Sequence, residues 1–245
     1  MKNSIICKYC NSENPFYNLN CSNCNAYLRD KVPNIDFWKT FCGIIFNPIE
    51  TFNLIIFAEK KNYVLIFNIL NSIAIFFASL IFSNLTINIK DTYAHNFISY
   101  NLIFLWFCVF LSINLIYILS YLIFKIYQKF NRFFLRIKDY FTVAIYSNLP
   151  IILWSFIIFP ISLATLGETL INWYPAPYLY KPLIFYTLLV LSVLFFIYNI
   201  VLYAIGIFSL IKRKLIATIM SLIYHALILG VMMYCWILVI NLYRY

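Results

Sequence analysis

Charged residues along the chain are gathered into short segments that are separated by long apolar intervals. Five intervals contain no Asp, Glu, Lys or Arg, and they are 28, 33, 28, 30 and 29 residues long. They lie between Lys61 and Lys90, Asp91 and Lys125, Asp139 and Glu168, Lys181 and Lys212, and Lys214 and Arg244. Because a bilayer core needs about 20 apolar residues per helix, each interval can hold one membrane span.

The apolar residues in these intervals show no two-residue alternation. Runs such as LIFLWFCVFL and LLVLSVLFFI are apolar on every face, which is typical of membrane helices and not of membrane strands. The pattern predicts an all-α polytopic membrane protein with a five-helix transmembrane bundle. Its spans are expected at about 62–84, 98–124, 140–166, 183–211 and 215–241. The composition agrees, since only 11% of residues are charged against about 25% in soluble domains.

Lysine and arginine are unevenly divided between alternate segments of the chain. The segment before the first span and the second and fourth loops carry 15 of them, and the other segments carry 3. Cytoplasmic segments are enriched in these residues, so we expect a cytoplasmic amino-terminus and an outer carboxy-terminus in a cell membrane, most simply a prokaryotic plasma membrane. The net charge of +10 then reflects topology and attraction to anionic lipid. No basic face with interleaved aromatics predicts nucleic-acid binding.

Residues 1–30 are polar and contain two CxxC pairs. Cys7, Cys10, Cys21 and Cys24 supply four thiolates that two tight turns can direct at one tetrahedral Zn²⁺. Paired disulfides are the alternative, and a reducing cytoplasm disfavours them. About 30 residues cannot build a sufficient core unaided, so the metal would supply most of the folding free energy. Four cysteines leave no open coordination position, which favours a structural zinc over a catalytic one.

The segment CKYCNSENPFYNLNCSNCNAYL resembles the short zinc-ribbon module found at the amino-terminus of many prokaryotic membrane and regulatory proteins. That module usually has glycine after each CxxC pair. Here Asn11 and Asn25 occupy these places. Asparagine is the next most tolerant residue of left-handed backbone, so we expect a positive φ at both positions.

Residues 31–58 form a segment of mixed polarity before the first span. The apolar residues Ile35, Trp38, Phe41 or Cys42, and Ile45 recur at helical spacing. Asn47-Pro48 ends this helix, and Pro48 is well placed to begin a second one. We expect the segment to lie at the cytoplasmic membrane interface, with Trp38 and Phe41 among the lipid headgroups. A linker packed beneath the bundle is the alternative.

A second basic amphipathic stretch lies in the loop after the second predicted span. In RFFLRIK, Phe133 can enter the headgroup region while Arg132 and Arg136 meet lipid phosphates. Residues 59–245, which include this stretch, would then form the transmembrane domain.

Two stretches resemble the Yip1 domain family. The first is FWKTFCGIIFNPIETFNLII with the Glu59-Lys60-Lys61 turn, and the second is DYFTVAIYSNLPIILWSFIIFP, with Tyr146 and Pro150 where the family carries a tyrosine and a mid-helix proline. The resemblance covers about residues 37–240. It implies a five-span bundle with a cytoplasmic amino-terminus. Eukaryotic relatives are linked to small GTPases of vesicle traffic and to membrane shaping, whereas for prokaryotic members the family implies no established activity.

Few residues within the predicted spans suggest an intramembrane site. His225 lies eleven residues past Lys214 and so near mid-membrane, where it is either a metal or proton site or an imidazole bonded to a neighbouring helix. Asn148 favours interhelical hydrogen bonding, and Pro150 and Pro160 are expected to kink the third span.

The specific features of the sequence gather on the cytoplasmic side. They predict a non-enzymatic membrane scaffold, adaptor or membrane-organising protein, in which a zinc-stabilised module binds a cytoplasmic protein partner; a homo-oligomer is compatible with this. The alternative is a small permease or channel that uses the proline-kinked third span. An enzyme is disfavoured because the spans contain no acidic or paired nucleophilic residues.

Overall fold

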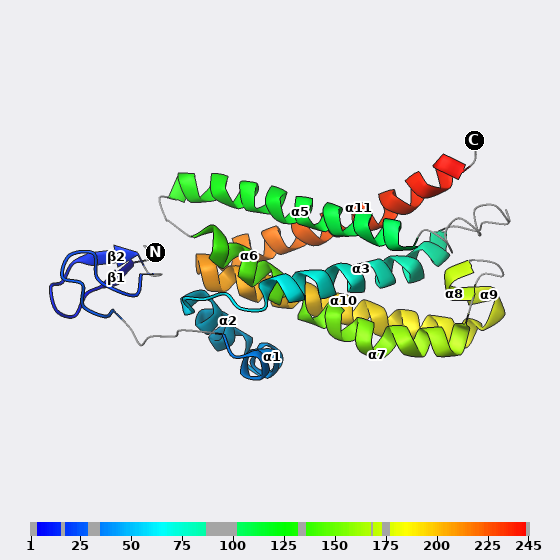
Figure 1. Cartoon of the computed structure of the whole chain (residues 1–245), viewed down its shortest axis with the longest axis horizontal. Coiled ribbons are helices and arrows are strands. Elements are labelled where there is room, and N and C mark those ends of the chain that lie inside the picture. Colours follow the sequence, from blue (N-terminus) through cyan, green and yellow to red (C-terminus); the bar gives the residue numbers. More distant parts are fainter. Residues whose placement is uncertain are drawn as a thin grey trace. The chain divides into compact units, whose positions relative to one another are not determined.

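A computed structural model describes most of the chain (Figure 1). The described residues are 4–15, 18–28, 35–86, 102–131, 136–167, 169–172 and 177–243, with side chains left out at 80–86, 102, 130–131, 171–172 and 234–243. Helices account for most of the described residues, as the charge pattern predicts.

The amino-terminal ribbon contains the only two strands of the described residues. Strand β1 (Ser4–Ile6) pairs antiparallel with β2 (Glu13–Pro15), and Ile5 lies opposite Asn14. An isolated antiparallel bridge between Asn20 and Tyr27 closes the following loop. A two-stranded hairpin is marginally stable by itself in water, so this ribbon needs a further source of stability.

Two short helices follow, with the boundary that Pro48 predicts. Helix α1 (Phe37–Phe46) begins after Asp36, whose Oδ1 accepts a hydrogen bond of 2.7 Å from the Lys39 backbone N–H. This is an ordinary N-cap. Helix α2 (Pro48–Phe57) begins directly after Asn47, where the missing N–H of a proline costs no helical hydrogen bond. The two helices pack against each other.

The remaining helices are mostly long and apolar. They are α3 (Val64–Thr86), α5 (Leu102–Asn131), α6 (Ile137–Tyr146), α7 (Leu149–Leu166), α8 (Thr169–Asn172), α9 (Pro177–Tyr180), α10 (Pro182–Ile211) and α11 (Lys214–Tyr243). Four stretches within the described residues are long and apolar enough to cross a membrane, namely Ile103–Lys129, Ile137–Leu166, Pro182–Ile211 and Lys214–Met233. These helices are consistent with the predicted membrane class.

Helix α3 is also apolar on average, but its stretch with described side chains, Val64–Ser79, is shorter than these four. It corresponds to the first of the five predicted spans. The count of five and the orientation of the bundle remain predictions.

The third predicted span consists of two helices in sequence. Helix α6 ends at Tyr146 and α7 begins at Leu149, with a turn at Ser147 and Asn148 between them. Pro150 lies in the first turn of α7 and so takes the position that best tolerates proline. The sequence predicts Pro150 as a mid-helix kink; in the structure the interruption comes just before it, and Pro160 is the proline inside α7.

The chain divides into two compact units. One comprises residues 1–65, 117–147 and 201–221, and the other comprises 66–116, 148–200 and 222–245. In the first unit, Gly206 of α10 permits a close approach of neighbouring side chains. A Cβ at this position would lie 2.8 Å from Val143 Cγ1 and 3.4 Å from the ring of Phe52.

Candidate metal centre and buried polar clusters

The four predicted cysteine ligands converge in the ribbon. Their Sγ atoms all lie within 4.8 Å of one another, with Cys7 to Cys24 at 3.6 Å and Cys10 to Cys21 at 3.4 Å. A tetrahedron of Zn–S bonds of about 2.3 Å has edges of about 3.8 Å, whereas a disulfide bond is about 2.05 Å. The four thiols are free, and together they can hold one metal ion, as the spacing predicts.

The backbone builds the two halves of this centre in the same way. The N–H of Asn11 donates to the carbonyl of Cys7 at 3.0 Å, and the N–H of Asn25 donates to the carbonyl of Cys21 at 3.0 Å. The φ angles of the two asparagines are 55° and 58°. The predicted positive φ is confirmed at both positions, so asparagine performs the role that glycine has in similar modules.

Asn14 joins the two halves, a role that the sequence does not reveal. Its side chain is 1% exposed. The Nδ2 group donates to the carbonyl of Ser12 at 2.9 Å and approaches Cys21 Sγ at 3.4 Å, while Oδ1 accepts from the backbone N–H of Ser22 at 2.8 Å. Such outer contacts orient the ligands of a metal site. The sequence places Asn14 between the two CxxC pairs, and its contacts to both halves are seen only in the structure.

Hydrogen bonds change the proton affinity of the thiols unequally. The hydroxyl of Ser12 lies 2.9 Å from Cys21 Sγ and is the main cause that lowers the pKa of Cys21 to about 5. The same hydroxyl lowers the pKa of Cys10. For Cys24, the backbone N–H of Ala26 lowers the pKa, but hydrogen bonding with neighbouring sulfurs and burial raise it to about 12. Four thiolates this close need a cation to ionise together.

The ribbon also exposes large apolar side chains. Ile6, Tyr9 and Tyr27 are 64%, 79% and 59% exposed. On a module of about 30 residues these side chains are available for contact with another molecule.

The expected interface residues of α1 share an aromatic cluster. The ring of Phe37 lies 5.2 Å from Trp38, 6.2 Å from Phe41 and 5.5 Å from Tyr63, measured between centroids. Trp38 is 71% exposed and Phe41 is half-buried. Their insertion into headgroups stays a prediction. Arg132 and Phe133, predicted for the second interfacial stretch, lie outside the described residues.

Arg136, the other predicted interface residue, belongs to a buried charge cluster around Asp139. The carboxylate of Asp139 is fully buried and receives Lys61 Nζ at 3.0 Å and Arg136 Nε at 2.8 Å. Lys61 also donates to the carbonyls of Ile55 and Ile56, and Arg136 to that of Ile56 at 3.4 Å. These carbonyls belong to the last turn of α2, where helical partners are missing. Two cations thus cap α2 and share one carboxylate.

This cluster is not evident from the sequence. There, Lys61 is one of the lysines and arginines that indicate the orientation in the membrane, and Asp139 is the charged residue that precedes the third predicted span. Burial is the main cause that lowers the pKa of Lys61, from 10.5 to about 8. Nearby, the hydroxyl of Tyr146, one of the residues of the Yip1 resemblance, donates to the carbonyl of Asn62 at 2.6 Å. The turn before α3 is therefore fastened to α6 at two points.

A second polar cluster contains two of the three remaining predicted site residues, His225 and Asn148, but not Pro150. Asn148 Nδ2 lies 2.8 Å from the hydroxyl of Tyr224, Asn199 Nδ2 lies 3.0 Å from Asn148 Oδ1, and Asn199 Nδ2 lies 2.7 Å from His225 Nε2. All four side chains are at most 2% exposed. His225 and Asn148 are thus linked through Asn199, whereas Pro150 lies in the adjoining helical turn and takes no part in these bonds.

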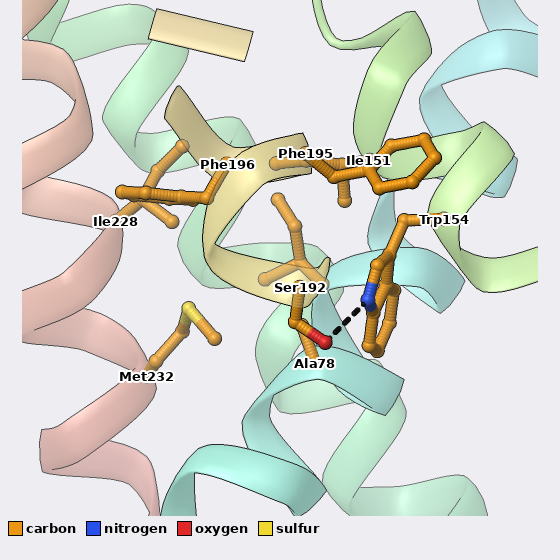
Figure 2. Close-up of a pocket in the computed structure, with 9 residues that line it drawn as sticks. Ala78, Ile151, Trp154, Ser192, Phe195, Phe196, Ile228 and Met232 are labelled. Atoms are coloured by element: carbon orange, nitrogen blue, oxygen red, sulfur yellow. Dashed lines mark hydrogen bonds between the residues drawn. The ribbon is translucent and has the colours of Figure 1, made fainter. Parts of the chain in front are cut away.

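A small cavity lies in the same compact unit (Figure 2). It measures about 20 Å³ and is lined by apolar side chains, with one hydrogen bond of 2.8 Å from Trp154 Nε1 to Ser192 Oγ. This volume holds about one water molecule. In the structure the cavity therefore has no room for a solute.

No family model matches this chain, and no curated protein and no solved structure matches it.

Proposed function

We propose that the protein is a non-enzymatic membrane scaffold or adaptor of the Yip1 type, with five spans, in a prokaryotic plasma membrane. Its amino-terminal ribbon lies in the cytoplasm and is stabilised by one structural Zn²⁺. The ribbon binds a protein partner, and the interfacial segments bind lipid. Neither a nucleic-acid ligand nor a catalytic step belongs to this proposal.

The convergence of four cysteine sulfurs within 4.8 Å is the observation that carries the proposal. A four-cysteine centre has no open position for a substrate, so its role is to hold the ribbon folded. A folded ribbon presents Ile6, Tyr9 and Tyr27, which are largely exposed. The uneven distribution of lysine and arginine favours the cytoplasm as the compartment in which these side chains meet a partner.

The zinc content and the partner can be tested together. The double variant Cys7→Ser with Cys10→Ser is expected to lose its zinc, measured as metal per purified chain, while the bundle still inserts into membranes. Crosslinking in native membranes, followed by quantitative identification of the captured proteins, is expected to lose one or more specific partners in this variant. Cys42→Ser is the matched control, because Cys42 is an exposed free thiol outside the cluster. Equal capture by the zinc-free variant would refute the adaptor role.

A small permease or channel is the second candidate, and the buried cluster of Asn148, Asn199 and His225 favours it. Polar groups at membrane depth commonly mark pathways for ions or solutes. Asn148 is itself one of the two turn residues that separate α6 from α7. Purified protein in liposomes is expected to move a small polar solute or an ion if this function holds, with Asn148→Leu as the inactive variant. Equal flux in empty and protein-containing liposomes, across a broad panel, would contradict it.

A further inference from the structure

Two close sulfur–sulfur contacts in the metal centre join one half of the ribbon to the other. Cys7 Sγ lies 3.6 Å from Cys24 Sγ, and Cys10 Sγ lies 3.4 Å from Cys21 Sγ. Neither contact lies within a CxxC pair. Four cysteines allow three disulfide connectivities, and these contacts correspond to the one in which Cys7 pairs with Cys24.

Each contact joins a buried sulfur to a more accessible one. Cys7 and Cys21 are 0% and 2% exposed, whereas Cys24 is exposed and Cys10 is half-buried. A small oxidant in the solvent can therefore reach one member of each contact, and the buried member lies within 3.6 Å of it. This is the arrangement of a reactive cysteine and its resolving cysteine.

Proton affinity does not decide which sulfur reacts when the metal is bound. Only the deprotonated form of cysteine binds zinc, so all four ligands are then thiolates. The thiolate is also the form that a peroxide oxidises. Accessibility therefore sets the order, and it favours Cys24 as the first site of attack.

Hydrogen bonds hold the two halves in register while the sulfurs rearrange. The backbone N–H of Cys7 donates to the carbonyl of Ser12 at 3.0 Å, and that of Cys21 donates to the carbonyl of Ala26 at 2.9 Å. Asn14 contacts both halves. A disulfide bond is about 2.05 Å long, so each sulfur contact has to shorten by about 1.5 Å. Side-chain rotation supplies a movement of this size without breaking the backbone hydrogen bonds.

We propose that the metal centre is a peroxide-sensitive switch, in which oxidation forms the disulfides Cys7–Cys24 and Cys10–Cys21 and releases the Zn²⁺. This inference rests on the structural zinc of the proposed function and adds the regulation of that site. The ribbon stays cross-linked after the metal has left, because both disulfides join the same two halves that the metal joins.

Each disulfide transfers two electrons to one hydrogen peroxide. The thiolate of Cys24 attacks one peroxide oxygen, so that an S–O bond forms, the O–O bond breaks and hydroxide leaves. The thiolate of Cys7 then attacks the sulfur of Cys24; the S–S bond forms, the S–O bond breaks and a second hydroxide leaves. Cys10 and Cys21 react in the same way. One ribbon therefore reduces two peroxides, yields four hydroxide ions and releases one Zn²⁺.

The proposal can be tested on the purified full chain in detergent, loaded with zinc under anaerobic conditions. Alanine in place of Cys42, Cys108 and Cys235 leaves the ribbon with the four remaining thiols of the chain. We expect hydrogen peroxide to release one zinc per chain, measured with a chromogenic chelator, while four alkylatable thiols disappear. Dithiothreitol in the presence of zinc should restore the thiols and the bound metal.

The disulfide connectivity separates this switch from unspecific oxidation. Partial reduction, alkylation and mass spectrometry should identify Cys7–Cys24 and Cys10–Cys21. Either other connectivity, sulfinic or sulfonic acids in place of disulfides, or zinc that stays bound in excess peroxide would overturn the switch alone. A purified chain that binds no zinc before oxidation would refute both the switch and the structural zinc of the proposed function.

Single substitutions test the pairing one bond at a time. Cys24→Ser removes the partner of Cys7, so peroxide should form only the Cys10–Cys21 disulfide. A disulfide between Cys7 and Cys10 in this variant would contradict the pairing. Asn23→Ser is the matched control, because Asn23 is exposed in the same turn, and it should oxidise like the parent. The connectivity in the parent decides the proposal even if Cys24→Ser fails to fold.

Discussion

The ammonium group of Lys61 lies 3.0 Å from the carboxylate of Asp139, and the two side chains are 8% and 0% exposed. The pair joins the turn before α3 to the first turn of α6 across 78 positions of sequence. Arg136 holds the second carboxylate oxygen, and both cations reach the last carbonyls of α2. Asp139 thereby connects the turn before α3 with the start of α6, and its two cations hold the end of α2 in place.

Removal of the carboxylate is expected to destabilise the protein strongly. In Asp139→Asn the buried Lys61 and the half-buried Arg136 lose their anion, and loss of one partner of a buried pair such as Lys61–Asp139 costs about 3–5 kcal/mol. Thermal unfolding in detergent should show a lower midpoint. Glu50→Gln is the matched control, because Glu50 is exposed and bonds only a neighbouring asparagine side chain among the described contacts. A midpoint for Asp139→Asn as high as that of the control would contradict the proposed importance of the cluster.

The lowered pKa of Lys61 predicts a pH dependence of stability. Burial lowers it to about 8 in the folded protein, against 10.5 for the ordinary group, so between these pH values the unfolded chain binds more protons than the folded one. The free energy of unfolding should therefore rise as the pH increases from about 8 to about 10.5. Comparison of unfolding at these pH values in the parent and in Lys61→Met measures the contribution.

In Lys61→Met the rise should be smaller than in the parent. Lys39→Met, at an exposed lysine of α1, should leave it unchanged. A rise of the same size in all three proteins would assign the effect to other groups.

Gly206 is expected to resist substitution because of the space around it. A Cβ there would lie 2.8 Å from Val143 Cγ1, so Gly206→Ala should lower the free energy of unfolding by about 1–3 kcal/mol through overpacking. At Gly230 nothing lies within 4 Å of the added atom, and Gly230→Ala should be neutral or stabilising because alanine favours the helix. Unfolding midpoints of the two variants provide the comparison, and equal midpoints would argue against a close approach at Gly206.

The left-handed backbone at Asn11 predicts a graded effect on metal affinity. Asn11→Gly should bind zinc at least as tightly as the parent, because glycine has no Cβ penalty at positive φ. Asn11→Val should bind about five- to thirtyfold more weakly, since the left-handed region costs about 1–2 kcal/mol for a residue that, unlike asparagine, cannot form local side-chain hydrogen bonds there. Competition with a chromogenic chelator measures both affinities on the full chain.

Asn23→Val provides the reference for this series, because Asn23 is also exposed in a CxxC turn but is not among the described residues with positive φ. Its zinc affinity should remain close to that of the parent. A loss at Asn23 equal to that at Asn11 would mean that valine harms the ribbon irrespective of backbone conformation.

Much of the architecture is predictable because its physical causes are local. A membrane helix requires about 20 apolar residues in succession, and this can be read position by position, so four predicted spans correspond to helices long and apolar enough to cross. The helix start at Pro48 and the positive φ at Asn11 also depend on single residues. The spacing of the cysteines likewise predicts their convergence, since two tight turns can direct four sulfurs at one point.

The buried polar clusters were decided by the tertiary structure. Burial of Asp139 and its pairing with Lys61 depend on segments far apart in sequence, and the same side chain at an exposed helix start would be an ordinary solvated charge. Asn148, Asn199 and His225 come from three elements, and each by itself is a common polar residue of a membrane helix. By itself the sequence determined the apolar helices and the cysteine centre, because local transfer free energy and ligand spacing suffice for these. The polar clusters required the packing of distant helices, because a hydrogen bond exists only when both partners are brought within about 3 Å.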